Sequence, residues 1–321
     1  IRDRSPSRGL GEVYKRQASN PGYNPNDLMG DSAEDTWANL QEQEGQPLVN
    51  HAGAETLPPG SIFKIITTAA GLNNGFDPSS TLTGSNVITL PDTVTELTNY
   101  ANQKCNGQDA VTLQTAFALS CNTAFVEMSE QLGADELRKY AKAFGVGENY
   151  DLGVSTSAGT LGDLPDGAAT AQSAIGQRDV TMTALQAAVM AGTVANKGTR
   201  MQPYLVNRIT DAQMKDVRTT KPKKADQAVN EETAATLTDL MYASERSSWG
   251  YDGNGFASKT GTAEHGEGLA PHVWYVAFDP ERDIAVGVVV KNGGNLGESA
   301  TGGKVSGPIG RAILRAYQGE Q

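Results

Sequence analysis

The sequence predicts an α+β fold, with helices in the middle of the chain and an antiparallel sheet towards its end. Two observations predict it. Between residues 111 and 145, apolar residues recur at helical spacing and glycines end the runs. From residue 255 onward, short runs rich in β-branched and aromatic residues are joined by Gly, Asp and Pro, which is typical of an antiparallel meander.

The individual elements follow in order along the chain. A helix is expected from about Ser61 to Leu72, because Asn-Asn-Gly then ends it. Residues 78–110 are rich in Thr, Ser and Asn and predict a loop with short β-like pieces. Trp274 and Tyr275 alternate along an expected strand, so we expect one in the core and the other facing a groove. The remaining elements are helices at 181–198, 231–245 and 306–318 and strands at 255–264, 272–280 and 284–293.

The composition limits the kind of protein. The chain has 321 residues with 38% hydrophobic content, which is enough for a sizeable core. A net charge of −11 argues against non-specific binding to nucleic acid. The longest apolar run, 284–290, is too short to cross a bilayer.

The N-terminal segment differs from the rest of the chain. Residues 1–17 carry five Lys or Arg against two Asp or Glu, and they have no apolar period. We expect this segment to be a non-native tail, derived from a cloning or sequencing linker and fused to a truncated reading frame. Residues 18–321 are then the folded domain, with a helical lobe at roughly 73–170. On this interpretation the native protein begins further upstream.

The segment 57–71, LPPGSIFKIITTAAG, places a serine and a lysine one helical turn apart among apolar residues. Ser61 and Lys64 are at positions i and i+3, which share one face of a helix. A serine needs an adjacent base to act as a nucleophile, and a lysine serves if burial or a nearby cation lowers its pKa from about 10.4 towards 7. The alternative interpretation is an ordinary helix cap and a lysine that extends to solvent.

Two further fragments favour the catalytic interpretation. Ser120 and Asn122 form a Ser-x-Asn pattern between two helical runs, and Lys259 opens a Lys-Thr-Gly-Thr run on an expected strand. Ser-x-x-Lys, Ser-x-Asn and Lys-Thr-Gly each occur once and in this order. The chain has no Gly-x-Ser-x-Gly elbow, which argues against an α/β-hydrolase.

With Pro-Pro-Gly before the serine, this ordered set resembles the transpeptidase domain of penicillin-binding proteins over almost all of residues 18–321. The opening SNPGYNPNDL and the segment QSAIGQRDVTMTALQAAVMAGTVAN are also similar to that family. SKTGTAEHG with PHVWYVAFDP resembles its class B members from actinobacteria, the PbpA type. The resemblance implies a β-lactamase/transpeptidase-like fold, in which an antiparallel five-stranded sheet is flanked by helices. It also implies a helical lobe, with the active site between lobe and sheet.

The resemblance further implies a serine D,D-transpeptidase that cross-links peptidoglycan stem peptides through an acyl-enzyme and is acylated by penicillin. Ser61 would be the nucleophile, Lys64 its general base, and Ser120 a proton relay between Lys64 and Lys259. Lys259 would also set the local field. Asn122 would bind the substrate amide, and Thr260 and Thr262 would bind its carboxylate. Gly261 would let the ligand approach the strand backbone closely. The N–H groups of Ser61 and Thr262 would form the oxyanion hole.

The same resemblance implies the surroundings of the domain. It implies no metal and no organic cofactor. The expected partners are peptidoglycan stem peptides, β-lactams as inhibitors and, in the full-length protein, a polytopic glycosyltransferase of the RodA/FtsW kind; nucleic acid is not among them. The expected location is the extracytoplasmic face of the cell membrane, reached through an N-terminal anchor and pedestal missing from this chain. Roles in division and in elongation both stay open.

The two cysteines, Cys105 and Cys121, are sixteen residues apart. Disulfides persist outside the cytoplasm, where the family works. A disulfide that holds the Ser120 loop is therefore one hypothesis, and two reduced cysteines are the other.

Two kinds of alternative function stay open. The first is another enzyme of the same superfamily, a serine β-lactamase or a D,D-carboxypeptidase. Against a class A β-lactamase, no Glu-x-x-Leu-Asn run occurs between Ser120 and Lys259, so a deacylating base is missing from its usual place. The second is an inactive scaffold of the cell-wall synthesis complex, or a β-lactam sensor. Loss of a motif residue would favour it, and all are present.

Overall fold

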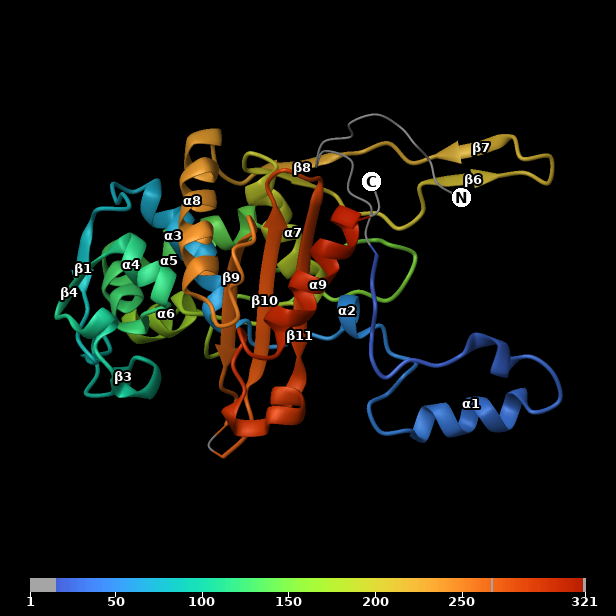
Figure 1. The fold of residues 1–321 in the computed structure, drawn as a ribbon, viewed down its shortest axis with the longest axis horizontal. Helices are drawn as coiled ribbons and strands as arrows, with labels where there is room; N and C mark the ends of the chain where they lie inside the picture. The colour runs from blue at the N-terminus through green and yellow to red at the C-terminus, as the bar shows by residue number, and fades with distance from the viewer. Residues whose placement is uncertain (1–15, 267, 320–321) are drawn as a thin grey trace.

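The computed structural model describes residues 16–266 and 268–319, so nearly all of the expected tail 1–17 lies outside the described residues. A three-stranded antiparallel sheet, in the order β11–β10–β9, stands at the centre of the C-terminal half (Figure 1). Its strands are β9 (Ala257–Ala263), β10 (His272–Asp279) and β11 (Ile284–Val290). Each strand is paired with the next along the chain, which confirms the expected meander.

Helices cover both faces of this sheet. The helix α7 (Ala184–Ala195) packs on β10 and β11 from one side, and α9 (Ser306–Gly319) packs on the same strands from the other (Figure 1). Trp274 belongs to the large core on the α7 side, and Tyr275 to a smaller core on the α9 side. The expectation that one of these two residues faces a groove is wrong. Both are fully buried, because the sheet has no uncovered face for either to occupy.

The α+β class and the transpeptidase-like fold are confirmed, but the sheet has three strands in the described part of the chain rather than the expected five. The other β segments pair locally as two-stranded ribbons. Each of their strands has three or four residues and at most one buried side chain, so none offers an apolar face for the central sheet to bury. These ribbons are β1 (Thr81–Thr83) with β4 (Ala110–Thr112), β2 (Val87–Thr89) with β3 (Glu96–Thr98), β5 (Thr199–Met201) with β8 (Lys224–Gln227), and β6 (Arg208–Thr210) with β7 (Asp216–Thr219).

A buried helix joins the sheet to the helical lobe. The expected helix at 61–72 is a 3-10 turn, η2 (Gly60–Phe63), followed by α3 (Lys64–Leu72). Every residue of α3 from Lys64 to Gly71 is buried, which matches a sequence whose only charged residue is Lys64. It packs against α5 (Asn122–Ala143) and against α8 (Glu231–Ser247), which runs beside β9. The lobe helices are α4 (Leu113–Leu119), α5 (Asn122–Ala143) and α6 (Gly167–Ala174).

The N-terminal part extends away from the core. The helix α1 (Ala33–Glu42) has no buried residue and projects outward (Figure 1). In the described ranges no helix combines the length and the apolar character needed to cross a bilayer. The remaining short helices are η1 (Pro25–Leu28), α2 (His51–Ala54), η3 (Tyr100–Asn102), η4 (Cys105–Gly107) and η5 (Lys291–Ser299).

Candidate active site

The turn η2 places Ser61 immediately before α3. The backbone N–H of Lys64 donates to the carbonyl of Ser61, so the two residues belong to one tight turn. Ser61 is half-buried, whereas Lys64 is fully buried. Ser61 is therefore partly accessible to a ligand, whereas the Lys64 side chain is shielded from solvent.

The amine of Lys64 points into the lobe. Its Nζ donates to the carbonyl oxygen of Ser120 at 2.7 Å and to Oδ1 of Asn122 at 2.8 Å, and it lies 3.4 Å from Ser120 Oγ. The ring of Phe125 lies below it, 5.2 Å from Nζ to the ring centroid. Phe125 and Asn122 of α5 thus contribute to the burial of this amine.

Lys259 approaches Ser120 from the sheet. Its Nζ donates to Ser120 Oγ at 2.9 Å and to the carbonyl of Thr260 at 3.1 Å. The Phe117 ring of α4 lies 5.7 Å from this amine. Ser120 Oγ consequently lies between two lysine amines, one from α3 and one from β9.

Burial changes the protonation of both amines. It lowers the pKa of Lys64 well below its ordinary value, and the positive charge of Lys259 lowers it further. Burial lowers the pKa of Lys259 to about 7. Near neutral pH a fraction of these amines is uncharged and able to accept a proton, which an exposed lysine is not.

The backbone of Ser120 has a left-handed conformation. It is the C-cap residue of α4, with φ 62° and ψ 38°, a region that residues with a Cβ rarely adopt. The next residue, Cys121, forms a disulfide with Cys105, with a Cα–Cα distance of 5.7 Å. The disulfide therefore joins the loop before β4 directly to the residue that follows Ser120.

Asn122 begins α5, and both ends of its side-chain amide are engaged. Oδ1 accepts from Lys64, and Nδ2 donates to the carbonyl of Thr98 at 3.0 Å. The second N–H of Nδ2 has no protein acceptor among the described residues, so it is available to a ligand. The buried Asn99 accepts from the backbone N–H of Thr123 at 3.1 Å and fixes this end of α5.

Glycines allow the Ser61 turn to lie directly against β9. A Cβ on Gly261 would lie 2.7 Å from the carbonyl oxygen of Pro59, and a Cβ on Gly60 would lie 2.8 Å from that of Thr262. Gly60 also has φ +53°. The turn that carries Ser61 and the strand that carries Thr262 are thus in backbone contact, which is the arrangement an oxyanion hole built from these two residues requires.

Thr260 and Thr262 are half-buried on β9 and follow Lys259 in the same strand. Thr262 Oγ1 accepts from the backbone N–H of Gly302 at 3.4 Å. In the described part of the chain, the edge of β9 that faces away from β10 has no partner strand. An extended ligand can pair with an open strand edge of this kind.

Three supporting residues were missed by the sequence analysis. The Trp274 Nε1 donates to the carbonyl of Pro58 at 2.8 Å and ties the sheet to the Ser61 turn. A Cβ on Gly176 would lie 2.2 Å from the carbonyl of Gly60, and Gly176 O accepts from Gly60 N at 2.9 Å. Glu245 lies behind β9. Gly176 and Glu245 carry no sequence signal that indicates a partner, and Trp274 was expected only as a strand residue in the core or facing a groove.

Comparisons with known proteins identify the family of the chain. A family model described as the penicillin binding protein transpeptidase domain matches residues 11–315. The peptidoglycan D,D-transpeptidase PbpA of Mycolicibacterium smegmatis is 44% identical over 312 residues, covering 93% of this chain and 63% of that protein. Its counterpart in Mycobacterium tuberculosis is 41% identical and covers 94% of this chain and 64% of that protein.

A solved structure of this family has a similar fold. Penicillin-binding protein A from M. tuberculosis, as its penicillin G acyl-enzyme complex, superposes with a TM-score of 0.89 at 41% identity. The superposition covers 94% of this chain and 71% of that one. The chain spans less than two thirds of the full length of the two PbpA relatives, at 63% and 64%.

Proposed function

This chain belongs to the penicillin-binding protein transpeptidase domain family, and from that premise we propose that it is a serine D,D-transpeptidase which cross-links peptidoglycan stem peptides. The observation that carries the proposal is the position of Ser120 Oγ between the buried amines of Lys64 and Lys259. Lys259 lies on β9, the strand against which the Ser61 turn packs. A surface serine and lysine would not be arranged in this way.

The first step is acylation of Ser61. Its Oγ attacks the carbonyl carbon before the terminal D-Ala of a stem peptide, and the uncharged amine of Lys64 accepts the hydroxyl proton. The backbone N–H groups of Ser61 and Thr262 stabilise the oxyanion that forms on the carbonyl oxygen. The C–N bond then breaks, and D-Ala leaves as an amine after taking a proton through Ser120 Oγ, which both lysine amines contact.

The remaining side chains bind the substrate. The hydroxyls of Thr260 and Thr262 donate hydrogen bonds to the terminal carboxylate, and the free N–H of Asn122 donates to the peptide carbonyl. The amine of a neighbouring stem then attacks the acyl carbon, forms the cross-link and releases Ser61. Penicillin acylates the same serine by opening its strained amide.

The proposal extends to the setting of the protein. We infer that the domain works on the extracytoplasmic side of the membrane, where the Cys105–Cys121 disulfide is stable. In the full-length protein, a membrane-anchoring segment and a glycosyltransferase of the RodA/FtsW kind are proposed on family grounds alone.

An intact-mass time course with benzylpenicillin tests the proposal. We expect a stable adduct of one drug molecule, absent in Ser61→Ala and retained in Ser129→Ala. The control serine is buried in α5 and donates only to the carbonyl of Val126, at 2.7 Å. A transient adduct with drug turnover would instead identify a β-lactamase. If folded protein takes no adduct, the inactive scaffold is favoured.

A further inference from the structure

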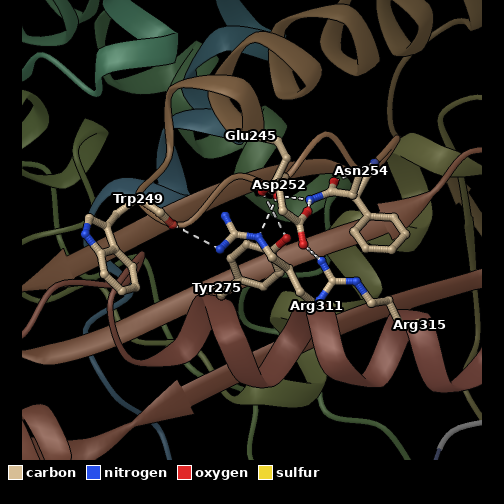
Figure 2. A network of polar contacts seen from close by, with 9 residues as sticks. Glu245, Trp249, Asp252, Asn254, Tyr275, Arg311 and Arg315 are labelled. Atoms are coloured by element: carbon tan, nitrogen blue, oxygen red, sulfur yellow. Dashed lines mark hydrogen bonds and ion pairs between the residues drawn. The ribbon is translucent and has the colours of Figure 1, made fainter.

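A buried polar network joins α8, α9 and the central sheet (Figure 2). At its centre is Glu245, in the last turn of α8, whose side chain is fully buried. An acidic side chain here is doubly unfavourable, because burial removes its hydration and the C-terminal end of a helix carries partial negative charge. Its presence therefore requires specific partners.

Four donors meet the two oxygens of this carboxylate. Oε1 accepts from Arg311 Nε at 2.7 Å and from Asn254 Nδ2 at 2.9 Å. Oε2 accepts from Tyr275 Oη at 3.0 Å and from the hydroxyl of Ser258 in a short hydrogen bond. The donors come from α9, the loop before β9, β10 and β9. One carboxylate thus links four separate parts of the fold.

Arg311 closes the network on the α9 side. Burial alone would lower the pKa of its guanidinium, and the hydrogen bond to Glu245 reverses this, so that the pKa is raised overall. Its Nη1 donates to the carbonyl of Trp249 at 3.0 Å, and its guanidinium lies 5.5 Å from the Tyr275 ring centroid. In Figure 2 Arg311 extends from α9 towards Glu245 beside this ring.

The network contacts β9 on both sides of Lys259. Ser258 directly precedes Lys259, and Tyr275 is the cross-strand partner of Thr260, which directly follows it. Successive side chains of a strand point to opposite faces, so Ser258 points to Glu245 while Lys259 points to Ser120. In the described ranges β9 is an edge strand with one neighbour, so contacts on its face help to set its position.

We propose that Glu245 is a positioning residue for the reaction, which acts through Ser258 and Tyr275 to hold β9 where the Lys259 amine meets Ser120 Oγ. This inference rests on the proposed transpeptidase function. A contribution to stability alone is a weaker explanation, because buried ion pairs often contribute little net stability compared with apolar residues of similar volume.

The test uses variants that leave the Glu245–Arg311 pair intact. Ser258→Ala and Tyr275→Phe each remove one hydroxyl that links the carboxylate to the sheet, without leaving a buried charge unpaired. Ser129→Ala is the matched control, because it also removes one buried hydroxyl but lies in α5. The measurements are the rate of acylation by benzylpenicillin across pH, the melting temperature, and deuterium exchange of residues 257–263.

We expect acylation of both variants to be slower by about tenfold or more, since small displacements of a reacting group have large effects on rate. We also expect the acid limb of their pH profile to move to higher pH, because a displaced Lys259 amine repels the charged form of Lys64 less and so lowers the pKa of Lys64 less. The control variant should have a lower melting temperature, with the acylation rate and pH profile of the parent. If both variants lose melting temperature but acylate with the rate and pH profile of the parent, the network is only a stabilising link and the inference is wrong.

Deuterium exchange separates this inference from the function on which it rests. If the parent chain takes no drug, the proposed function fails. Residues 257–263 can then still be compared by exchange. If they exchange faster in Ser258→Ala but not in the control, the result supports the inference that Glu245 positions β9. Unchanged exchange in that segment would overturn it.

Discussion

Lys64 and Lys259 place two amines within 3.4 Å of one hydroxyl, that of Ser120. Two ammonium groups at such a distance repel each other, and neither has a carboxylate partner among the described residues. The site therefore favours states in which at least one amine is uncharged. This is the property that a lysine base needs near neutral pH, and it follows from burial by Phe125 and Phe117 and not from the motif spacing alone.

Acylation should depend on pH in a specific direction. Uncharged Lys64 is the active form, so the rate should fall as pH drops through its lowered pKa and level off on the alkaline side. The check is the rate constant for benzylpenicillin acylation from about pH 5 to about pH 9. A lysine with an ordinary pKa would instead give a tenfold rise per pH unit over that whole range, which would contradict the arrangement.

The buried Lys259 should also lower stability. Its pKa is about 7 in the folded chain against 10.5 in the unfolded one, so the unfolded state binds more protons between these values. Stability should therefore rise with pH over that window, and the full cost, of the order of a few kcal/mol, applies below pH 7. Lys259→Met should raise the melting temperature at pH 6 while abolishing acylation. A lower melting temperature would mean that the hydrogen bonds of this amine outweigh its burial.

At the scale of elements, the site depends on how closely η2 approaches β9. Gly261→Ala should push η2 and β9 apart, because the new Cβ would lie 2.7 Å from Pro59 O and 3.1 Å from Ile62 Cγ2. The carbonyl of Pro59 belongs to the backbone and cannot move aside as the end of a flexible side chain can. We expect acylation to slow by about a hundredfold, with about 1–3 kcal/mol lost from stability. Gly255→Ala is the control, since a Cβ there meets no atom within 4 Å. Equal acylation by both variants would show that the close approach is not needed.

The disulfide between η4 and the start of α5 should hold Ser120 in its left-handed backbone conformation. Cys105→Ser should destabilise the fold by about 3 kcal/mol, as expected for a loop of this length. It should also slow acylation, because Ser120 loses the constraint on its neighbour. Chemical denaturation and the benzylpenicillin rate, each with and without a reductant, check both effects. If the fully reduced parent chain is acylated at an unchanged rate, the disulfide does not contribute to the active site.

At the scale of the molecule, the sequence predicted the parts whose signal is local. The order of the helices, the C-terminal meander and the break that carries Ser120 were all predicted, because periodicity and turn residues specify them. The network around Glu245 was not, since its partners are contributed by α9, β9 and β10 and only the packed fold brings them together. The resemblance implied five strands in the central sheet, and the described residues form three. The burial of both Trp274 and Tyr275 was not predicted, because helices elsewhere in the chain cover the two faces of the sheet.

The ribbon β6–β7 projects from the molecule (Figure 1), and we expect it to be dispensable. None of its strand residues is buried, so it adds almost no apolar burial to the fold. Its base is already closed, because Thr220 N donates to Asn207 O at 2.7 Å. Replacing residues 208–219 by Asn-Gly should form a two-residue hairpin turn between these ends. The shortened chain should keep its melting temperature and acylation rate, as a thermal scan and the drug assay would establish. A loss of acylation with unchanged melting temperature would assign this ribbon a role in the site that its contacts do not suggest.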